Sequence, residues 1–373
     1  MISQSHLDEK QTVDLGSFYT PTFIVEIVYD MVLKQILNQN FDIRDFILLD
    51  TSCGYGNFLK TPLDFDKKIG ADIDKKAIEI AKDNFKNFKK SPLFLVGNSL
   101  FNLKREKFNI KESDKIIIVG NPPYNDKTSI IKSHIKNQDF DLVDIDLKHR
   151  DLGISFLLSF AHLCADFICI LHPLSYLIKE SNFKSMKKFY KNYILVDSLI
   201  ISSEVFCPNS LSFFPILIAL YKRDNEGMDF DYIKNHTFKT IENKSFRLND
   251  FDFISNYIDK YPNKNKVLSS QKVAMFYTMR DINALRRSKT FITKDCNNAV
   301  YIPKSKYSLY CFVDVFKQII SHIPYYFGNC DVMIDYDGFL KLEDEFIKSS
   351  QTKILNSKVM DYFKNLLRDH YED

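Results

Sequence analysis

The stretch Phe46–Phe58, FILLDTSCGYGNF, decides the fold of this chain. Its first five residues form an apolar run that ends at Asp50, as a buried β-strand does. Gly54 and Gly56 then allow a sharp turn and a close approach of the backbone to a ligand, and the residues beyond offer free helix N–H groups. The glycine spacing is not GxGxxG, which disfavours a dinucleotide, and the missing Lys-Ser/Thr excludes a triphosphate P-loop.

Strand-like and helix-like segments alternate around this stretch over the first 220 or so residues. The expected strands are 46–50, 68–72, 93–96, 115–119, 167–171, 194–201 and 213–221. Helical patterns cover 75–90, 153–165 and 178–191. This alternation predicts an α/β fold with a mostly parallel sheet covered on both faces. The last two strands have no full helix between them, so we expect an antiparallel edge strand. Ligands bind such sheets beyond the carboxyl ends of the strands.

The length of 373 residues favours two domains. The polar, glycine-containing stretch 225–235 marks a boundary, because the alternating pattern ends there. We therefore expect a first domain over residues 1–224 and a smaller α+β domain over residues 225–373.

Composition and cysteine usage are those of a globular protein in a reducing compartment. Hydrophobic residues make up 45% and charged residues 27% of the chain, which excludes a disordered or collagenous protein. The seven cysteines form no CxxC pair and no zinc-binding spacing, so we expect no metal site and a cytoplasmic location. The N-terminus lacks the apolar region of a secretion signal. The apolar stretch 152–178 is interpreted as a helix followed by a buried strand, not a membrane span.

Two further motifs follow expected strands. In GADID, residues 70–74, Asp72 can accept both hydroxyls of a ribose, and Ile73 can pack on a flat base. In GNPPY, residues 120–124, consecutive prolines stiffen the turn so that the Asn121 side-chain oxygen and the Pro122 carbonyl point one way. Two converging acceptors suit an amino group, and Tyr124 offers a ring to stack on a planar base.

A basic segment stands out in the C-terminal part. From Lys260 to Lys306 the chain has 11 basic residues and two acids, although the whole chain carries a formal charge of only +3. Such a concentration is typical of a phosphate-binding face, with a solvated lysine-rich surface as the alternative. The expected contacts to DNA phosphates or a guanine edge are Arg280, Arg286, Arg287 and Lys289.

DTSCGYGNF, GADID and GNPPY, in this order and spacing, resemble the S-adenosylmethionine-dependent DNA adenine-N6 methyltransferases of restriction–modification systems. The segment Ser17–Pro21, the pair His172-Pro173 and the segment 198–222 also match motifs of that family. The resemblance covers about residues 15–222. It implies the gamma arrangement, in which a Rossmann-like catalytic domain precedes a target-recognition domain.

The resemblance also implies roles for individual residues. Asp72 would hold the ribose hydroxyls and Ile73 would lie against the cofactor adenine, while Asn98 replaces an acid that bonds the cofactor amino group in many members. Phe206 matches an aromatic that packs on the target base opposite Tyr124. The implied cofactor-binding residues are Thr20, Asp50, Cys53, Gly54, Gly56, Asp72, Ile73 and Asn98. The implied catalytic residues are Asn121, Pro122, Pro123 and Tyr124.

The implied reaction is methyl transfer from S-adenosyl-L-methionine to N6 of an adenine flipped out of duplex DNA. Hydrogen bonds from N6 to Asn121 and Pro122 would localise its lone pair, so the protein supplies positioning and electrostatics without a metal or a covalent nucleophile. Two alternatives stay open. The same motif occurs in enzymes that methylate a release-factor glutamine amide or guanine N2 of RNA, and the chain could be a catalytically silent nucleic-acid-binding subunit.

The expected partner is double-stranded DNA, and a separate restriction endonuclease acting on the same site is a further candidate. We expect a monomer with no membrane association. The polar stretch Asn125–Arg150 is expected to become ordered when DNA binds.

Overall fold

The computed structural model describes residues 20–124, 142–208 and 213–372. These residues form two compact units. The first unit comprises the described residues up to 208 together with Ile216–Ile233, and the second comprises 213–215 and 234–372. The first unit thus extends beyond the expected boundary at 224, into α9 (Phe230–Asn235). The described residues do not include 125–141, which make up most of the polar stretch expected to become ordered when DNA binds. They also do not include residues 17–19 of the N-terminal motif.

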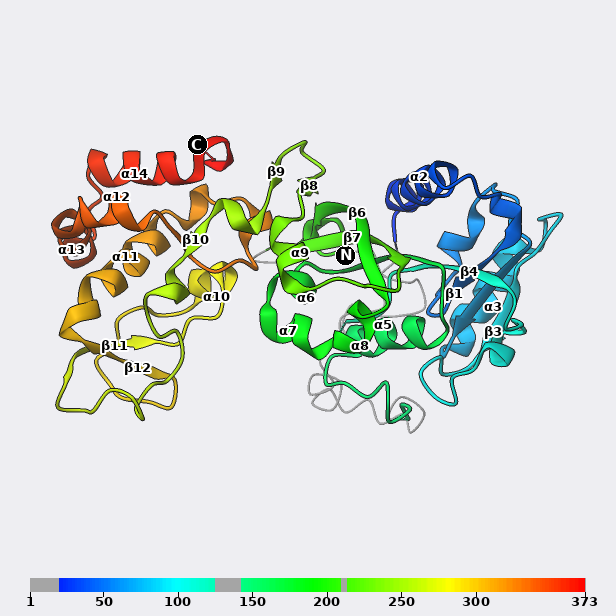
Figure 1. The fold of residues 1–373 in the computed structure, drawn as a ribbon, viewed down its shortest axis with the longest axis horizontal. Helices are drawn as coiled ribbons and strands as arrows, with labels where there is room; N and C mark the ends of the chain where they lie inside the picture. The colour runs from blue at the N-terminus through cyan, green and yellow to red at the C-terminus, as the bar shows by residue number, and fades with distance from the viewer. Residues whose placement is uncertain (1–19, 125–141, 209–212, 373) are drawn as a thin grey trace. The chain divides into compact units, whose positions relative to one another are not determined.

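The sheet of the first unit confirms the mostly parallel α/β fold (Figure 1). Its strands are β1 (Phe46–Asp50), β2 (Lys67–Asp72), β3 (Leu93–Val96), β4 (Lys115–Gly120), β5 (Phe167–Pro173), β6 (Tyr193–Ser202) and β7 (Pro215–Arg223). They follow the order β3-β2-β1-β4-β5-β7-β6. β1 is parallel to β2 and β4, and β4 is parallel to β5. The direction of chain progression therefore reverses between β1 and β4.

The expected antiparallel strand is present, but it does not lie at the edge. β7 pairs antiparallel with β5 and lies between β5 and β6. Its first seven residues, Pro215–Tyr221, are all buried. A strand that is buried on both faces is best accommodated with neighbours on both sides, which explains why β7 is an interior strand.

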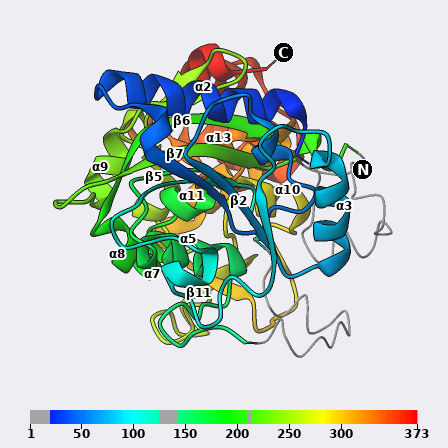
Figure 2. The ribbon, with the colours of Figure 1, turned by 90° about the vertical axis from the view of Figure 1, so that its right-hand side faces the viewer.

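Helices cover both faces of this sheet (Figures 1 and 2). α2 (Thr22–Asn38) and α3 (Lys75–Phe85) pack on one face, where their apolar residues share a core cluster with Phe46 and Leu48 of β1. α5 (Leu152–His162) and α8 (Lys187–Tyr190) lie on the opposite face. Successive strand residues point to opposite faces, so an apolar run such as FILL contributes to both layers.

The helix expected over 178–191 is interrupted. Its residues form α6 (Ser175–Ile178), α7 (Glu180–Ser185) and α8 instead. Lys179 between the first two has extended backbone angles, with φ −93° and ψ 112°. The apolar stretch 152–178 is a helix followed by the buried strand β5, as expected. Within the described part of the chain, no helix has the length and apolar character needed to cross a membrane.

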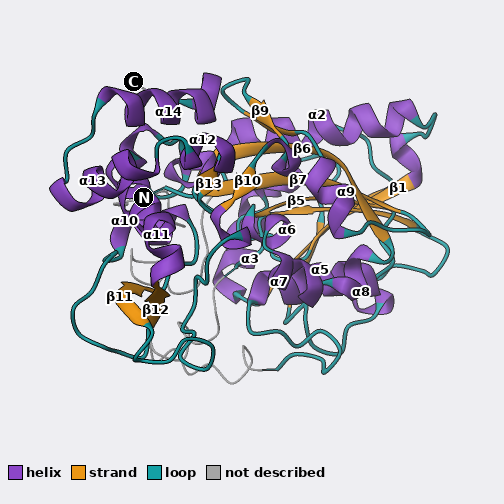
Figure 3. Cartoon of the chain, turned by 60° about the vertical axis from the view of Figure 1, so that its left-hand side comes forward, coloured by secondary structure: helices purple, strands orange, loops and turns teal. Residues whose placement is uncertain are grey.

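The second unit is an α+β assembly, as expected (Figure 3). Its antiparallel pairs are β8 (Phe238–Thr240) with β9 (Ser245–Phe246), β10 (Asp252–Phe253) with β13 (Met333–Ile334), and β11 (Lys272–Tyr277) with β12 (Ala299–Pro303). Its helices are α10 (Ile282–Arg287), α11 (Tyr307–Gln318), α12 (Tyr336–Leu340), α13 (Glu343–Thr352) and α14 (Ser357–Leu367). Phe312 of α11 lies at the centre of an aromatic core, with the rings of Phe346 and Phe363 centred 5.1 and 5.8 Å away.

His172, in β5, is a buried titratable group. Its Nε2 lies 2.7 Å from the Tyr221 hydroxyl, and its Nδ1 lies 2.9 Å from the carbonyl oxygen of Pro173. Because a carbonyl can only accept, Nδ1 carries the proton and Nε2 accepts from Tyr221. Burial lowers the pKa of His172 to about 4. The folded protein therefore favours the neutral ring.

We expect this ring to make the protein sensitive to acid. An unfolded histidine takes up its proton near pH 6.5, so the contribution of His172 to folded-state stability is lost as pH falls from about 6.5 to about 4. In His172→Gln this contribution is absent. The difference in unfolding free energy between wild type and variant should therefore shrink with acidification, by up to about 1.4 kcal/mol per pH unit. Urea titrations at several pH values measure it, and a constant difference would contradict the assignment.

Candidate active site

The carboxyl ends of β1 and β4 meet where the strand order reverses, the usual ligand position in such sheets. Asp50 ends β1 and is 1% exposed, and Gly120 ends β4. A Cβ added at Gly120 would lie 2.9 Å from Oδ1 of Asp50. Residue 120 must therefore lack a side chain for the two strand ends to approach this closely, which explains the glycine before Asn121.

Asp50 is an unusual carboxyl group. Burial, together with the nearby carboxylate of Asp72, raises its pKa to about 8, even though the backbone N–H of Ser52 donates to Oδ1 over 3.1 Å. A buried carboxyl that resists ionisation is stabilised as an anion by a neighbouring positive charge. The switch point therefore suits a ligand that carries a cationic group.

Asp72 fixes the glycine loop from the end of β2. Its Oδ2 accepts from the N–H of Gly54 at 2.8 Å, and its Oδ1 accepts from the N–H of Asp74 at 2.9 Å. Gly54 and Gly56 have φ values of 49° and 79°, in the left-handed region that favours glycine. The glycine loop therefore passes close to the Asp72 carboxylate.

Three other residues predicted to bind the cofactor lie around this loop. Cys53 is buried, and burial raises the pKa of its thiol, so it remains a neutral thiol and not a nucleophile. Ile73 is half-buried directly after β2. Asn98 follows β3, where its Oδ1 accepts from the N–H of Leu100 at 2.9 Å and its Nδ2 donates to the carbonyl of Leu142 at 2.7 Å.

The GNPPY motif and the N-terminal motif meet at Asn121. The Tyr124 hydroxyl donates to Oδ1 of Asn121 at 2.7 Å, and Nδ2 of Asn121 lies 3.3 Å from Oγ1 of Thr20. The carbonyl oxygen of Thr20 accepts from Nδ2 of Asn57, in the turn η2 (Asn57–Lys60), at 3.0 Å. Thr20 therefore links two segments that are distant in sequence, since its hydroxyl contacts the Asn121 carboxamide and its carbonyl contacts Asn57. Asn57 lies inside the quoted glycine motif, but no sequence signal singled it out.

The N-terminal end of helix α5 packs against Tyr124. Asp151 caps the helix by accepting from the N–H of Gly153 at 3.0 Å, and it also accepts from the Tyr176 hydroxyl. A Cβ added at Gly153 would lie 3.0 Å from the Tyr124 Cβ and 2.5 Å from the Tyr176 hydroxyl. Sequence reasoning missed Gly153, although a chain with only 10 glycines in 373 residues gives each of them weight.

Gly153→Ala is expected to slow turnover at this site by roughly 10- to 100-fold, because displacing Tyr124 by part of an ångström misaligns it with a substrate. Ligand binding at Asp50 and Asp72 should remain, since neither residue touches Gly153. Adding Tyr176→Phe removes the nearer clash and leaves only the one with Tyr124. If the double variant regains full activity, the slower turnover of Gly153→Ala comes from the clash with Tyr176 and not from displacement of Tyr124.

Phe206, predicted to pack on a target base, is buried in the core cluster that lies between the sheet and α2. It follows the turn Ser203–Val205, and its N–H donates to the Ser203 carbonyl at 3.0 Å. A stacking role for Phe206 would require it to leave this core, so that role stays a prediction.

The predicted DNA-contacting residues of the second unit are all exposed, near and within α10. Arg286 donates to the carbonyl of Ile320 at 3.1 Å, so its guanidinium is partly committed to the fold. Within the described part of the chain, no carboxylate lies within 4.0 Å of the cationic groups of Arg280, Arg286, Arg287 or Lys289.

Other members of the basic segment are neutralised locally. Lys260 pairs with Asp331 at 2.7 Å, and Lys264 pairs with Asp295 at 2.7 Å. Lys266 likewise lies 3.0 Å from Asp259. Asp259 and Asp331 fall outside the segment 260–306, so its charge in the folded protein is lower than the sequence count indicates.

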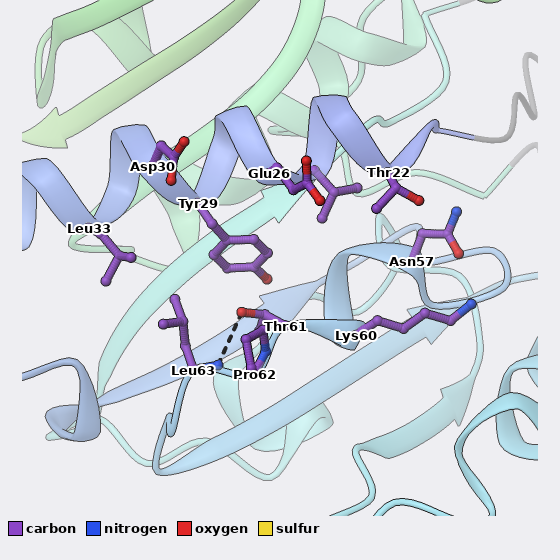
Figure 4. A pocket seen from close by; sticks show the side chains of 11 residues that line it. Thr22, Glu26, Tyr29, Asp30, Leu33, Asn57, Lys60, Thr61, Pro62 and Leu63 are labelled. Atoms are coloured by element: carbon purple, nitrogen blue, oxygen red, sulfur yellow. Dashed lines mark hydrogen bonds between the residues drawn. The ribbon is translucent and has the colours of Figure 1, made fainter.

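A cavity of about 320 Å³ lies between α2 and residues 57–63 (Figure 4). Glu26, Asp30 and Tyr29 line it from the helix, and Lys60 lines it from the opposite side. Asn57, which binds Thr20, also forms part of its wall. Asp50 and Asn121 do not line it, so this cavity is separate from the switch point.

No family model matches the chain, and no curated protein matches it. Solved structures resemble it at low identity. A candidate class I S-adenosylmethionine-dependent methyltransferase from Listeria monocytogenes is 17% identical with a TM-score of 0.42, covering 59% of this chain and 65% of that one. The modification subunit of a candidate type I restriction enzyme from Vibrio vulnificus is 18% identical with a TM-score of 0.41, covering 60% and 47%.

The methyltransferase subunit of a type I restriction-modification system from Streptococcus thermophilus is 13% identical with a TM-score of 0.39, covering 88% of this chain and 57% of that one. The chain thus spans less than two thirds of the length of each of these three proteins. With TM-scores below 0.5, none of them assigns a role to a residue of this chain.

Proposed function

We propose that this chain is an S-adenosyl-L-methionine-dependent DNA methyltransferase that modifies N6 of an adenine flipped out of the duplex. The observation that carries the proposal is the position of Asn121. Its carboxamide follows β4 directly, at the sheet edge where Asp50 ends β1, and it is held between Thr20 and Tyr124. A carboxamide acceptor beside a site for a cationic ligand is what methylation of an amino group requires.

The residues at the switch point fit this cofactor. Asp50 is a buried carboxyl that a positive charge would stabilise, and Asp72 stands at the end of the next strand, where a ribose would lie. The glycine loop, which lies between Asp50 and Asp72 in the sequence, would pack against the nucleoside part of the cofactor. When bound, S-adenosyl-L-methionine supplies a methyl group on a positively charged sulfur, which is a good leaving group.

The chain's own contribution is to position and polarise the amino group. The Asn121 oxygen and the Pro122 carbonyl would accept its two N–H groups, which favours a pyramidal nitrogen with a localised lone pair. Tyr124 would stack on the base and recover part of the cost of flipping it, on the order of 1–3 kcal/mol. Methylated N6 then loses one proton to solvent.

The direct test is incubation with radiolabelled cofactor and a duplex DNA library of random sequence, followed by single-molecule sequencing. N6-methyladenine at a recurring sequence is the expected product. Methyl incorporation into RNA or a release factor, with none into DNA, would contradict the DNA assignment and favour methylation of a different amino group. Absence of transfer to all three would leave a nucleic-acid-binding subunit as the better explanation.

The basic residues of α10 are expected to contribute to DNA affinity. Replacing Arg286 and Arg287 together with Ala should weaken binding to all sequences alike and reduce the logarithmic salt slope by nearly 2, about 0.9 for each lost phosphate contact. Loss of discrimination at one base pair would instead indicate guanine recognition, at about 1–3 kcal/mol. Lys341→Ala, another exposed cation of the second unit, is the matched control. Unchanged salt slopes on cognate and scrambled duplexes would show that α10 does not contact DNA.

A further inference from the structure

Thr20 is a buried residue that connects two motifs of the candidate site through hydrogen bonds. It is 5% exposed and precedes Pro21, the N-cap residue of α2, and both of its oxygens are engaged within the protein. Its carbonyl accepts from Asn57, 37 residues away, and its hydroxyl oxygen accepts from Asn121, 101 residues away. The glycine motif thus holds the Thr20 backbone, and the Thr20 side chain holds the carboxamide of the GNPPY motif.

The two ends of a carboxamide differ chemically. Only the oxygen of Asn121 can accept a hydrogen bond from a substrate amino group, because the nitrogen end is a donor and would meet another donor. When a base enters and Tyr124 turns to stack on it, the bond between Tyr124 and Oδ1 is given up to the substrate. The contact between Nδ2 and Thr20 is then the bond that keeps the oxygen end facing the amino group.

We propose that Thr20 is a positioning residue that holds the Asn121 carboxamide with its oxygen toward the substrate amino group. This role rests on the proposed function, and it differs from the cofactor contact that the family resemblance implies for Thr20. A hydroxyl that binds the cofactor controls cofactor affinity. A hydroxyl that orients Asn121 controls the rate of transfer and leaves cofactor affinity unchanged.

The two roles are separated by Thr20→Val and Thr20→Ser, with Thr22→Val as control because Thr22 is exposed on the same segment. Thr20→Val is expected to lower the single-turnover rate of methyl transfer by roughly 10- to 100-fold, the loss that follows when a buried donor has no acceptor. Calorimetry should give a dissociation constant for S-adenosyl-L-methionine within about twofold of wild type. Thr20→Ser keeps the oxygen and should recover most of the rate. A normal rate with weakened cofactor binding would overturn the proposal.

A double-mutant cycle on stability tests the contact without any enzyme activity. Unfolding is measured for wild type, Thr20→Val, Asn121→Ala and the combined variant. Because the two side chains share one hydrogen bond, the combined loss should be smaller than the sum of the single losses. Additive losses would overturn the proposal whether or not methyl transfer is observed. If the losses are not additive but the protein transfers no methyl group, the contact between Thr20 and Asn121 is supported and the proposed function is rejected.

Discussion

Asn121→Ala is expected to reduce methyl transfer by roughly 100- to 1,000-fold, the loss seen when a single preorganised hydrogen-bonding group at a reacting centre is removed. The carboxamide oxygen is the acceptor that localises the lone pair of the substrate nitrogen. Cofactor affinity should remain near wild type, since Asp50 and Asp72 are untouched. A tritiated-methyl assay run beside calorimetric titration of the cofactor measures both quantities.

The matched control is Asn87→Ala, the same substitution at an exposed position of the first unit. It should leave both rate and affinity unchanged. Near-normal turnover by Asn121→Ala would show that another group activates the amino nitrogen, and the proposed mechanism would then fail. A parallel loss of cofactor affinity would instead show that Asn121 lies in the cofactor site itself.

Cofactor affinity should depend strongly on pH because of Asp50. Burial raises the pKa of this carboxyl to about 8, so at lower pH the cationic ligand must displace a proton in order to bind. The dissociation constant should therefore rise by about 50-fold between pH 8 and pH 6, with the slope approaching tenfold for each pH unit well below 8. Among the neighbouring titratable groups, Tyr29 and Cys53 have pKa values raised by burial and stay neutral over this range, and burial also raises the pKa of Asp72.

Calorimetry in buffers of different ionisation enthalpy should show release of close to one proton at pH 6.5. Asp50→Asn, titrated in parallel, corrects for the ligand's own amino group and should remove both the proton release and the steep dependence. Wild-type affinity that follows the same pH profile as Asp50→Asn would refute the role assigned to Asp50.

Local pattern was enough to predict most of the first unit. The strands at 46–50 and 93–96 match the structure because short apolar runs bounded by turns need little context. The position of β7 could not be read this way, because the pairing of a strand with β5 and β6 is a long-range choice. The break at Lys179 was also missed, since every residue around it is compatible with a helix.

In the candidate site, too, local motifs could be predicted from the sequence and long-range contacts could not. Motif order placed Asp50, Asp72 and Asn121 at strand ends, and the structure brings these ends to one edge of the sheet. The contact between Thr20 and Asn121 spans 101 residues, so no local pattern could indicate it. The ion pair between Lys260 and Asp331 is also long-range in sequence, and it lowers the charge of a segment whose sequence is strongly basic.

Asp50 and His172 together give the ligand-free protein an asymmetric response to pH. The raised pKa of Asp50 costs the folded state stability as pH rises from about 4 to about 8, whereas the lowered pKa of His172 acts in the opposite direction between about 4 and 6.5. The two contributions offset each other in acid, and only that of Asp50 remains above pH 6.5. The ligand-free protein thus has a lower folding stability at the higher pH values at which a cationic ligand binds best. This is a trade-off between stability and function. Binding of the ligand offsets the loss, because a ligand that binds the folded state stabilises it.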